Sequence, residues 1–336
     1  MSCAPLLKAY DGKTILITGA MGYIGSALVQ RLSGYQCRII MSSRLGGCGH
    51  WADTPANASI ETFPGEITDA DFWQRALESC AADMIFHFAG QNSVYKAAEN
   101  PMADFATNVA PIINLAEAIR AIPKKIDVLY SGTATVVGMT ENLPVSPDTT
   151  VRPVTIYDQH KLMAEQYLEL YARMGDLRVV TLRLANVYGP GINVGSLDRG
   201  ILNKVIAAAL DGNPVSIFGE GDSIRDYIYI DDVIDAFVYA GAHMKNITGR
   251  HYYLGTGTGH LIKDAFNLAV AQATVASGRN VDISHVSWPD DFSEIERRNF
   301  VADIDDFREA TGWRPKVDLA EGIKKTIASF LVEGAA

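Results

Sequence analysis

The sequence contains few cysteines and has neither a long apolar run nor an apolar leader. Its cysteines, Cys3, Cys37, Cys48 and Cys80, have no metal-ligand spacing and are too few in 336 residues for a disulfide framework. No segment approaches the roughly 18 apolar residues of a membrane span, and the first residues lack the basic start of a signal peptide. We therefore expect a cytoplasmic protein with reduced thiols, no metal site and no membrane partner.

Basic residues are also scarce. The sequence has 29 Lys and Arg residues against 39 Asp and Glu residues, which gives a net charge of −10, and it contains no basic run. Because such a chain repels polyanions, nucleic acid is excluded as the main partner. A few Arg side chains and helix N-termini are still sufficient to bind an anionic small molecule.

The sequence does contain a regular alternation of apolar strands and helical segments. Its length and a hydrophobic content of 48% suit a large α/β domain with a smaller lobe. Because helical crossovers join parallel strands, the first half predicts a Rossmann-type, doubly wound parallel sheet. The expected strands cover 14–18, 38–41, 84–88, 127–130, 178–182 and 215–218, and the clearest helices cover 108–119, 157–171 and 201–210.

The alternation weakens after Gly189-Pro190-Gly191, where a smaller lobe is expected to begin. Later, residues 227–230 and 251–254 have the pattern of strands that return to the main sheet. We predict a dinucleotide-binding Rossmann domain and a C-terminal α/β substrate lobe, formed by residues 1–185 plus 226–258 and by residues 186–225 plus 259–336.

The first expected strand ends at a glycine-rich turn, Gly19-Ala20-Met21-Gly22-Tyr23-Ile24-Gly25, that leads into a helix. Such a turn directs backbone N–H groups and the helix dipole at a pyrophosphate, although its spacing is one residue longer than the usual fingerprint. The turn resembles that of the extended short-chain dehydrogenase/reductases, in particular the NAD-dependent epimerase/dehydratase family. The expected cofactor-binding residues of the turn are Gly19, Met21, Gly22, Tyr23 and Ile24.

NAD-binding folds usually place a carboxylate at the end of the second strand, where it binds the adenosine ribose. This sequence instead has Ser42, Ser43 and Arg44, which would bind a 2′-phosphate and favour NADP over NAD, unless Arg44 is only an exposed loop residue. The resemblance implies further cofactor contacts at the adenine and at the end of a later strand: Glu66, Ile67, Phe88, Ala89 and Gly90.

Tyr157 and Lys161 are four residues apart in a helical stretch, so both side chains lie on one face. The segment from Tyr130 to Gly138 resembles the family's catalytic Ser/Thr segment, with Thr133 in the active position. In that case Lys161 would lower the pKa of Tyr157 and hold the nicotinamide ribose, while Tyr157 exchanges a proton with the substrate. The alternative is a packed Tyr, a solvated Lys and a helix-capping Thr.

The resemblance extends from residue 14 to about residue 330 and implies a nucleotide-diphosphate sugar as substrate. Asn186 lies in the segment that leads to the substrate lobe, and Phe218 lies in the expected base-binding strand and turn. Arg225 and Arg298, the latter preceded by Arg297, are the expected phosphate contacts. Contacts with the hexose are implied for Ser93 and Val94.

The residues after Thr133 indicate the reaction. Ala134-Thr135 stands where sugar 4,6-dehydratases of the family have an Asp-Glu pair and decarboxylases have a Glu, so proton donors for water loss are missing. The pair is similar to that of 4-epimerases, which oxidise C4, let the 4-keto sugar turn over and return hydride to the other face. We therefore predict a nucleotide-sugar 4-epimerase with tightly bound NAD(P), a homodimer by family habit.

Two departures from the family pattern leave alternatives open. Val137 replaces a typical Tyr, and Tyr157 is followed by Asp158-Gln159-His160 in place of Gly/Ala-x-Ser/Thr, with His160 as a local hydrogen-bond partner or a structural residue. The missing ribose carboxylate also suits an NADPH-dependent reductase of a 4-keto-6-deoxy sugar. A non-catalytic nucleotide-sensing protein on the same fold is the third alternative.

Overall fold

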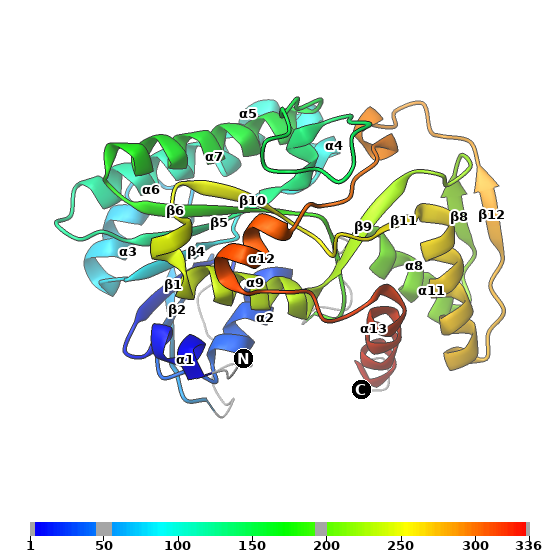
Figure 1. Cartoon of the computed structure of the whole chain (residues 1–336), viewed down its shortest axis with the longest axis horizontal. Helices are drawn as coiled ribbons and strands as arrows, with labels where there is room; N and C mark the ends of the chain where they lie inside the picture. Colours follow the sequence, from blue (N-terminus) through cyan, green and yellow to red (C-terminus); the bar gives the residue numbers. More distant parts are fainter. Residues whose placement is uncertain (1–3, 45–55, 192–199, 334–336) are drawn as a thin grey trace.

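A central sheet of parallel strands organises the computed structural model, which describes residues 4–44, 56–191 and 200–333. Within this part of the chain the sheet has seven strands in the order β10-β6-β5-β4-β1-β2-β3 (Figure 1). The order reverses on the two sides of β1, as in a doubly wound fold. The strands are β1 (Thr14–Thr18), β2 (Arg38–Ser43), β3 (Ser59–Pro64), β4 (Met84–His87), β5 (Asp127–Thr133), β6 (Arg178–Leu184) and β10 (Arg250–Leu254).

Helices cover both faces of this sheet because its strands are apolar on both sides. In β1, Ile15 and Ile17 pack into one buried cluster and Leu16 packs into another. The first cluster includes α2 (Tyr23–Leu32) and α9 (Ile230–Ala242), with α1 (Ala4–Tyr10) and α10 (Met244–Ile247) beside them. The opposite face carries α3 (Phe72–Cys80), α6 (Ala110–Arg120) and α7 (Ile156–Met174) (Figure 1). The Rossmann-type prediction is therefore confirmed.

A small lobe lies beside the carboxyl-terminal ends of the central strands (Figure 1). It contains a three-stranded sheet, β11-β9-β7, and a parallel pair, β12-β8, with mutually packed helices. Its strands are β7 (Asn186–Tyr188), β8 (Val215–Phe218), β9 (Ile224–Tyr229), β11 (Gly259–Leu261) and β12 (Ile283–Val286), and its helices are α8 (Ile201–Asp211), α11 (Ile262–Ser277) and α13 (Leu319–Glu333). The remaining elements are α4 (Val94–Glu99), α5 (Pro101–Asn108), α12 (Asp305–Thr311) and the 3₁₀ turns η2 (Ala134–Val137) and η3 (Glu294–Arg297).

One of the two strands expected to return to the main sheet does so. Residues 250–254 form β10, which pairs in parallel with β6. The expectation for 227–230 was wrong, because β9 pairs with β7 and β11 instead. The precise domain boundaries stay a prediction, since one buried cluster continues from Tyr10 through both lobes to Phe330.

Two further sequence-based expectations concern the cysteines and the membrane. Cys37 and Cys80 are buried free thiols, and Cys3 and Cys48 lie outside the described residues. None of the helices in the described ranges has the length and apolar character needed to cross a membrane.

Candidate active site

The helix α7 supplies most of the chemical groups of the site. It begins after Thr155, whose hydroxyl caps the helix by accepting from the backbone N–H of Asp158 at 3.1 Å. The buried stripe of the helix includes Asp158, Lys161 and Glu165, which are three and four residues apart. Because a buried charge is costly unless it is paired or hydrogen-bonded, three charged groups on this stripe require specific partners.

Lys161 is fixed to the end of β5. Its ammonium donates to the carbonyl of Ser131 at 2.8 Å and lies 4.2 Å from the centre of the Tyr130 ring. Burial lowers the pKa of Lys161 to about 7, although the carboxylates of Glu165 and Asp104 act in the opposite direction. Lys161 therefore changes charge near neutral pH, and its ammonium has N–H groups to spare for a ligand.

Tyr157 and Thr133 meet at the same strand end. The Thr133 hydroxyl lies close enough to the phenol of Tyr157 to lower its pKa. Burial raises the pKa of Tyr157, and the nearby carboxylates of Asp158 and Asp104 raise it further, against a smaller lowering effect of Thr133. Burial and the two carboxylates thus favour the protonated phenol, and the expected lowering of the Tyr157 pKa by Lys161 stays a prediction.

Further hydroxyl groups connect this pair to Asp158. The hydroxyls of Thr133 and Thr135 are 2.7 Å apart and hydrogen-bonded, and Thr135 donates to Oδ1 of Asp158. Thr155 donates to Oδ2 of the same carboxylate at 2.7 Å. The sequence analysis did not identify Asp158 as a functional residue, although an acid on the buried face of a helix beside Tyr157 was an available signal.

A second polar cluster supports the other side of α7. Nδ1 of His160 is hydrogen-bonded to Asp104 at 2.6 Å, and Asp104 also accepts from Gln91 at 2.6 Å and from Asn108 at 3.0 Å. This confirms His160 as a local hydrogen-bond partner. A side chain at Gly90 would place its Cβ 2.6 Å from Oδ1 of Asn108, so the loop after β4 needs a glycine there.

The glycine turn after β1 fits the pyrophosphate of a dinucleotide. Gly22 precedes α2 in an extended conformation, and no side chain caps the helix, so its first N–H groups face outward. Gly19 has a φ of +66°, and a Cβ on it would lie 2.8 Å from the amide nitrogen of Ala89. A Cβ on Gly25 would lie 2.1 Å from the Gly19 carbonyl oxygen. Only glycines allow this close approach of the turn, the helix and the segment that follows β4.

Other predicted cofactor residues surround the turn. Met21 is partly exposed, Ile24 is half-buried, and the Tyr23 hydroxyl donates to the Gly189 carbonyl at 2.9 Å. The half-buried Phe88 packs edge-on against Phe237 with ring centres 4.8 Å apart.

The residues of the predicted adenosine site at the end of β2 differ in their exposure. Ser42 is buried, Ser43 is half-buried, and Arg44 is exposed, with the guanidinium of Arg44 4.0 Å from the carboxylate of Glu66. Ile67 beside them is buried. A weak exposed ion pair of this kind leaves Arg44 free to contact a phosphate.

Two buried arginines lie close together where the small lobe meets α7. Arg298 donates to Asn186 at 3.5 Å, and its Nε has no partner among the described residues. Arg225 donates to the backbone carbonyls of Ile224, Glu296 and Arg298, so it holds the segment that carries Arg298. Burial, followed by the charge of Arg298, lowers the pKa of Arg225 to about 9. An anion bound here would relieve this repulsion.

An aromatic pocket of about 260 Å³ opens near the end of β8. Phe218 and Trp288 line it with stacked rings whose centres are 5.6 Å apart, and the Arg297 guanidinium lies 5.2 Å from the centre of the Trp288 ring. The sequence analysis missed Trp288. The predicted hexose contacts lie elsewhere, at the start of α4, where Ser93 is the N-cap and Val94 is half-buried.

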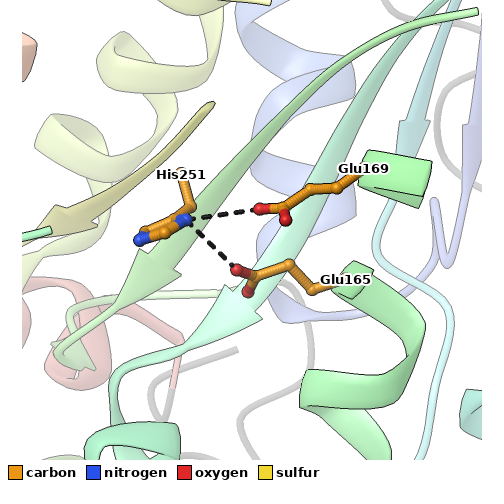
Figure 2. Close-up of side chains that lie close together, drawn as sticks. All are labelled: Glu165, Glu169 and His251. Atoms are coloured by element: carbon orange, nitrogen blue, oxygen red, sulfur yellow. Dashed lines mark hydrogen bonds and ion pairs between the residues drawn. The ribbon is translucent and has the colours of Figure 1, made fainter. Parts of the chain in front are cut away.

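Glu165, Glu169 and His251 are residue types that can bind a metal, but their contacts are those of an ion-pair network. Figure 2 shows both carboxylates directed at one nitrogen of His251, Nδ1, which is 3.5 Å from Glu165 and 3.3 Å from Glu169. The other nitrogen lies 3.1 Å from the Pro147 carbonyl oxygen. Since all these oxygens only accept, His251 must donate from both nitrogens and is a cation. With Arg183, which pairs with Glu165, two cations balance two carboxylates, so we interpret the cluster as an ion-pair network.

The chain is similar to proteins of one family. Residues 15–255 match the family model described as the NAD dependent epimerase/dehydratase family. A UDP-glucose 4-epimerase of Mycolicibacterium smegmatis is 33% identical over 317 residues, which is 94% of this chain and 97% of that protein.

Two solved structures share the fold over almost the whole chain. The UDP-glucose 4-epimerase of Thermotoga maritima, solved with UDP-glucose, has a TM-score of 0.80 and 30% identity, and the match covers 95% of this chain and 99% of that chain. The UDP-glucose 4-epimerase of Thermus thermophilus, solved with NAD, has a TM-score of 0.79 and 27% identity, with coverage of 96% and 100%.

Proposed function

Because this chain belongs to the NAD dependent epimerase/dehydratase family, we propose that it epimerises a nucleotide-diphosphate sugar at C4 of the hexose through a transient 4-keto sugar. The observation that carries the proposal is the meeting of Thr133, Tyr157 and Lys161 at the end of β5. The relatives named above are UDP-glucose 4-epimerases that match this chain over nearly their whole length, and they support the same reaction.

The residues of the chain divide the work of binding and proton transfer. A bound nicotinamide would supply the acceptor and donor of hydride. The glycine turn and the N-terminus of α2 would hold its pyrophosphate. Lys161, which makes one hydrogen bond within the described residues, would hold the ribose hydroxyls with its remaining N–H groups. Tyr157 would take the proton of the sugar hydroxyl and later return it to the ketone.

The substrate side has the features that a nucleotide diphosphate requires. Arg298 has an unpartnered buried Nε, and its neighbour Arg225 is destabilised as a cation, so a diphosphate would find two positive groups already in place. The exposed face of Phe218 and the ring of Trp288 offer a stacking surface for the base.

The second candidate function is an NADPH-dependent reductase of a nucleotide 4-keto-6-deoxy sugar. Arg44 favours it, because this guanidinium and the Ser43 hydroxyl stand where a ribose-binding carboxylate would select NAD. We propose NADP as the preferred cofactor on the same ground.

Incubation of the protein with a panel of nucleotide sugars, with and without NADPH, tests these proposals. An isomerised sugar without net consumption of cofactor supports the epimerase. Stoichiometric loss of NADPH with a 4-keto sugar supports the reductase, and binding without turnover of any sugar supports a nucleotide sensor. Light scattering tests the expected homodimer.

Tyr157→Phe is the matching variant. It should lower kcat on the order of 10²- to 10⁴-fold, because the ring remains but the exchangeable proton is lost. Cofactor binding, measured by calorimetry, should be unchanged. Wild-type turnover by the Phe variant would remove Tyr157 from the mechanism.

A further inference from the structure

A row of hydrogen-bonded hydroxyl groups leads from beside the phenol of Tyr157 to a buried carboxylate. Thr133, which lies close enough to the phenol of Tyr157 to lower its pKa, is hydrogen-bonded to Thr135 at 2.7 Å, and Thr135 donates to Oδ1 of Asp158. Asp158 is 0% exposed, and Thr155 occupies its other oxygen at 2.7 Å. The row therefore ends at a carboxylate that is not exposed to solvent.

The ionised carboxylate fixes the direction of every hydrogen bond in the row. A hydroxyl has one proton, and that of Thr135 is donated to Asp158. Thr133 must then donate to Thr135, because Thr135 has no proton left for it. Thr133 in turn accepts from the backbone N–H of Thr135 at 3.3 Å, which leaves its second lone pair for the proton of the nearby Tyr157 phenol. All protons point toward Asp158, which is the arrangement that a proton transfer in that direction requires.

We propose that Asp158 is a positioning residue that accepts, through Thr135 and Thr133, the proton that Tyr157 releases when it deprotonates the sugar hydroxyl. The inference rests on the proposed function. In the oxidation step the C4 hydride goes to NAD(P)⁺ and the hydroxyl proton goes to the Tyr157 oxygen, while the phenolic proton moves to Thr133, that of Thr133 to Thr135, and that of Thr135 to Asp158. Return of hydride to the ketone reverses each transfer.

The charges around the site favour this route over a free phenolate. A phenolate at Tyr157 would stand beside the carboxylates of Asp158 and Asp104, and both raise the pKa of Tyr157. Transfer along the row leaves Asp158 neutral and Tyr157 protonated, so no second negative charge is formed. Burial raises the pKa of Asp158, the hydrogen bonds from Thr135 and Thr155 and the charge of Arg298 lower it, and Glu296 raises it.

An acid in the first turn of a helix is also a common stabilising feature, and the test must separate this role from proton transfer. Thr135→Val removes only the connecting hydroxyl, whereas Thr135→Ser retains it. Thr326→Val is the matched control, because Thr326 is a buried Thr in α13 whose hydroxyl donates to the Gly322 carbonyl at 2.7 Å, far along the chain from the site.

The experiment measures kcat across pH for wild type, Asp158→Asn, Thr135→Val, Thr135→Ser and the double variant Asp158→Asn/Thr135→Val. We expect each of the first two variants to lose on the order of 10²-fold in kcat at neutral pH and to recover as the pH rises toward the phenol range. The double variant should be no slower than either single variant. Thr135→Ser and Thr326→Val should retain the wild-type profile.

A wild-type pH profile for Thr135→Val, or an equal loss for Asp158→Asn at every pH, would overturn the proposal. A second readout does not depend on sugar turnover. The ultraviolet titration of Tyr157, taken as the difference between each protein and its Tyr157→Phe form with NADP⁺ bound, should show a lower phenol pKa in Asp158→Asn. An unchanged phenol pKa there overturns the role of Asp158, whereas failure of wild type on every nucleotide sugar overturns only the proposed function.

Discussion

The variant Glu165→Gln removes the charge that balances Arg183 beneath α7. In the wild type the guanidinium donates to the Glu165 carboxylate at 2.6 Å and 3.1 Å, and both side chains are only 2% exposed. A glutamine keeps one acceptor oxygen but turns an NH₂ group toward the guanidinium, which leaves a buried cation without its counter-charge. Breaking a buried pair in this way costs about 3–5 kcal/mol. At about 2 °C per kcal/mol for a long chain, the thermal midpoint should fall by roughly 6–10 °C.

Thermal unfolding followed by far-ultraviolet circular dichroism measures this shift at a fixed protein concentration. Glu169→Gln is the control, because Glu169 is 21% exposed and, among the residues that the structure describes, pairs with His251 and not with Arg183, so it should cost less than about 1 kcal/mol. The double variant Glu165→Gln/Arg183→Met removes both charges and should recover most of the lost midpoint. A Glu165→Gln protein that unfolds at the wild-type midpoint would refute the assignment of this pair as a buried structural contact.

Three further predictions concern pH, cofactor and base. Burial lowers the pKa of His251, but the hydrogen bond to Glu169, the charge of Glu165 and the hydrogen bond to Pro147 together outweigh burial and Arg183, so the folded-state pKa is above 6.5. The stabilisation is therefore present below pH 6.5 and is lost as the pH rises through the folded value. The thermal midpoint should fall more steeply over that range in wild type than in His251→Gln. Parallel curves for the two proteins would contradict this sign. Arg44→Ala should weaken NADP⁺ binding, measured by calorimetry, by about 10- to 100-fold and leave NAD⁺ binding unchanged. An equal loss of affinity for both cofactors would show that Arg44 does not contact the 2′-phosphate. Trp288→Ala should raise the KM for a nucleotide sugar by roughly 5- to 150-fold with little change in kcat, because stacking on a base contributes about 1–3 kcal/mol. An unchanged KM would exclude the aromatic pocket as the base site.

The central strands could be predicted from sequence because they are buried on both faces and therefore read as continuous apolar runs. The run Thr14–Thr18 is almost entirely buried, and the structure has β1 at those residues. The edge strand β3 was not expected, since its residues alternate between exposed and half-buried, include Glu61 and end in a proline. For β9 the pattern predicted a strand correctly, but a pattern does not name the neighbour with which a strand pairs.

The same distinction applies to the site. Spacing and the family resemblance selected Tyr157, Lys161 and Thr133, and these groups do meet at the end of β5. The contact between Thr135 and Asp158 spans 23 positions in the chain, and an acid at the start of a helix has the same sequence pattern whether it caps the helix or accepts a buried hydroxyl. How strongly burial raises the Tyr157 pKa could likewise not be predicted, because it depends on how deeply the phenol lies in the fold.

The buried cluster that joins Ile15 and Phe237 to Ile206 and Phe330 has a consequence for protein engineering. A fragment that stopped near residue 185 would keep the cluster's side chains on β1, β2 and α2 without the later residues that cover them, so it should aggregate when it is expressed without the rest. For the same reason, a chimaera that takes its sugar specificity from a relative must import the matching apolar side chains of α9 and β1 along with the grafted lobe.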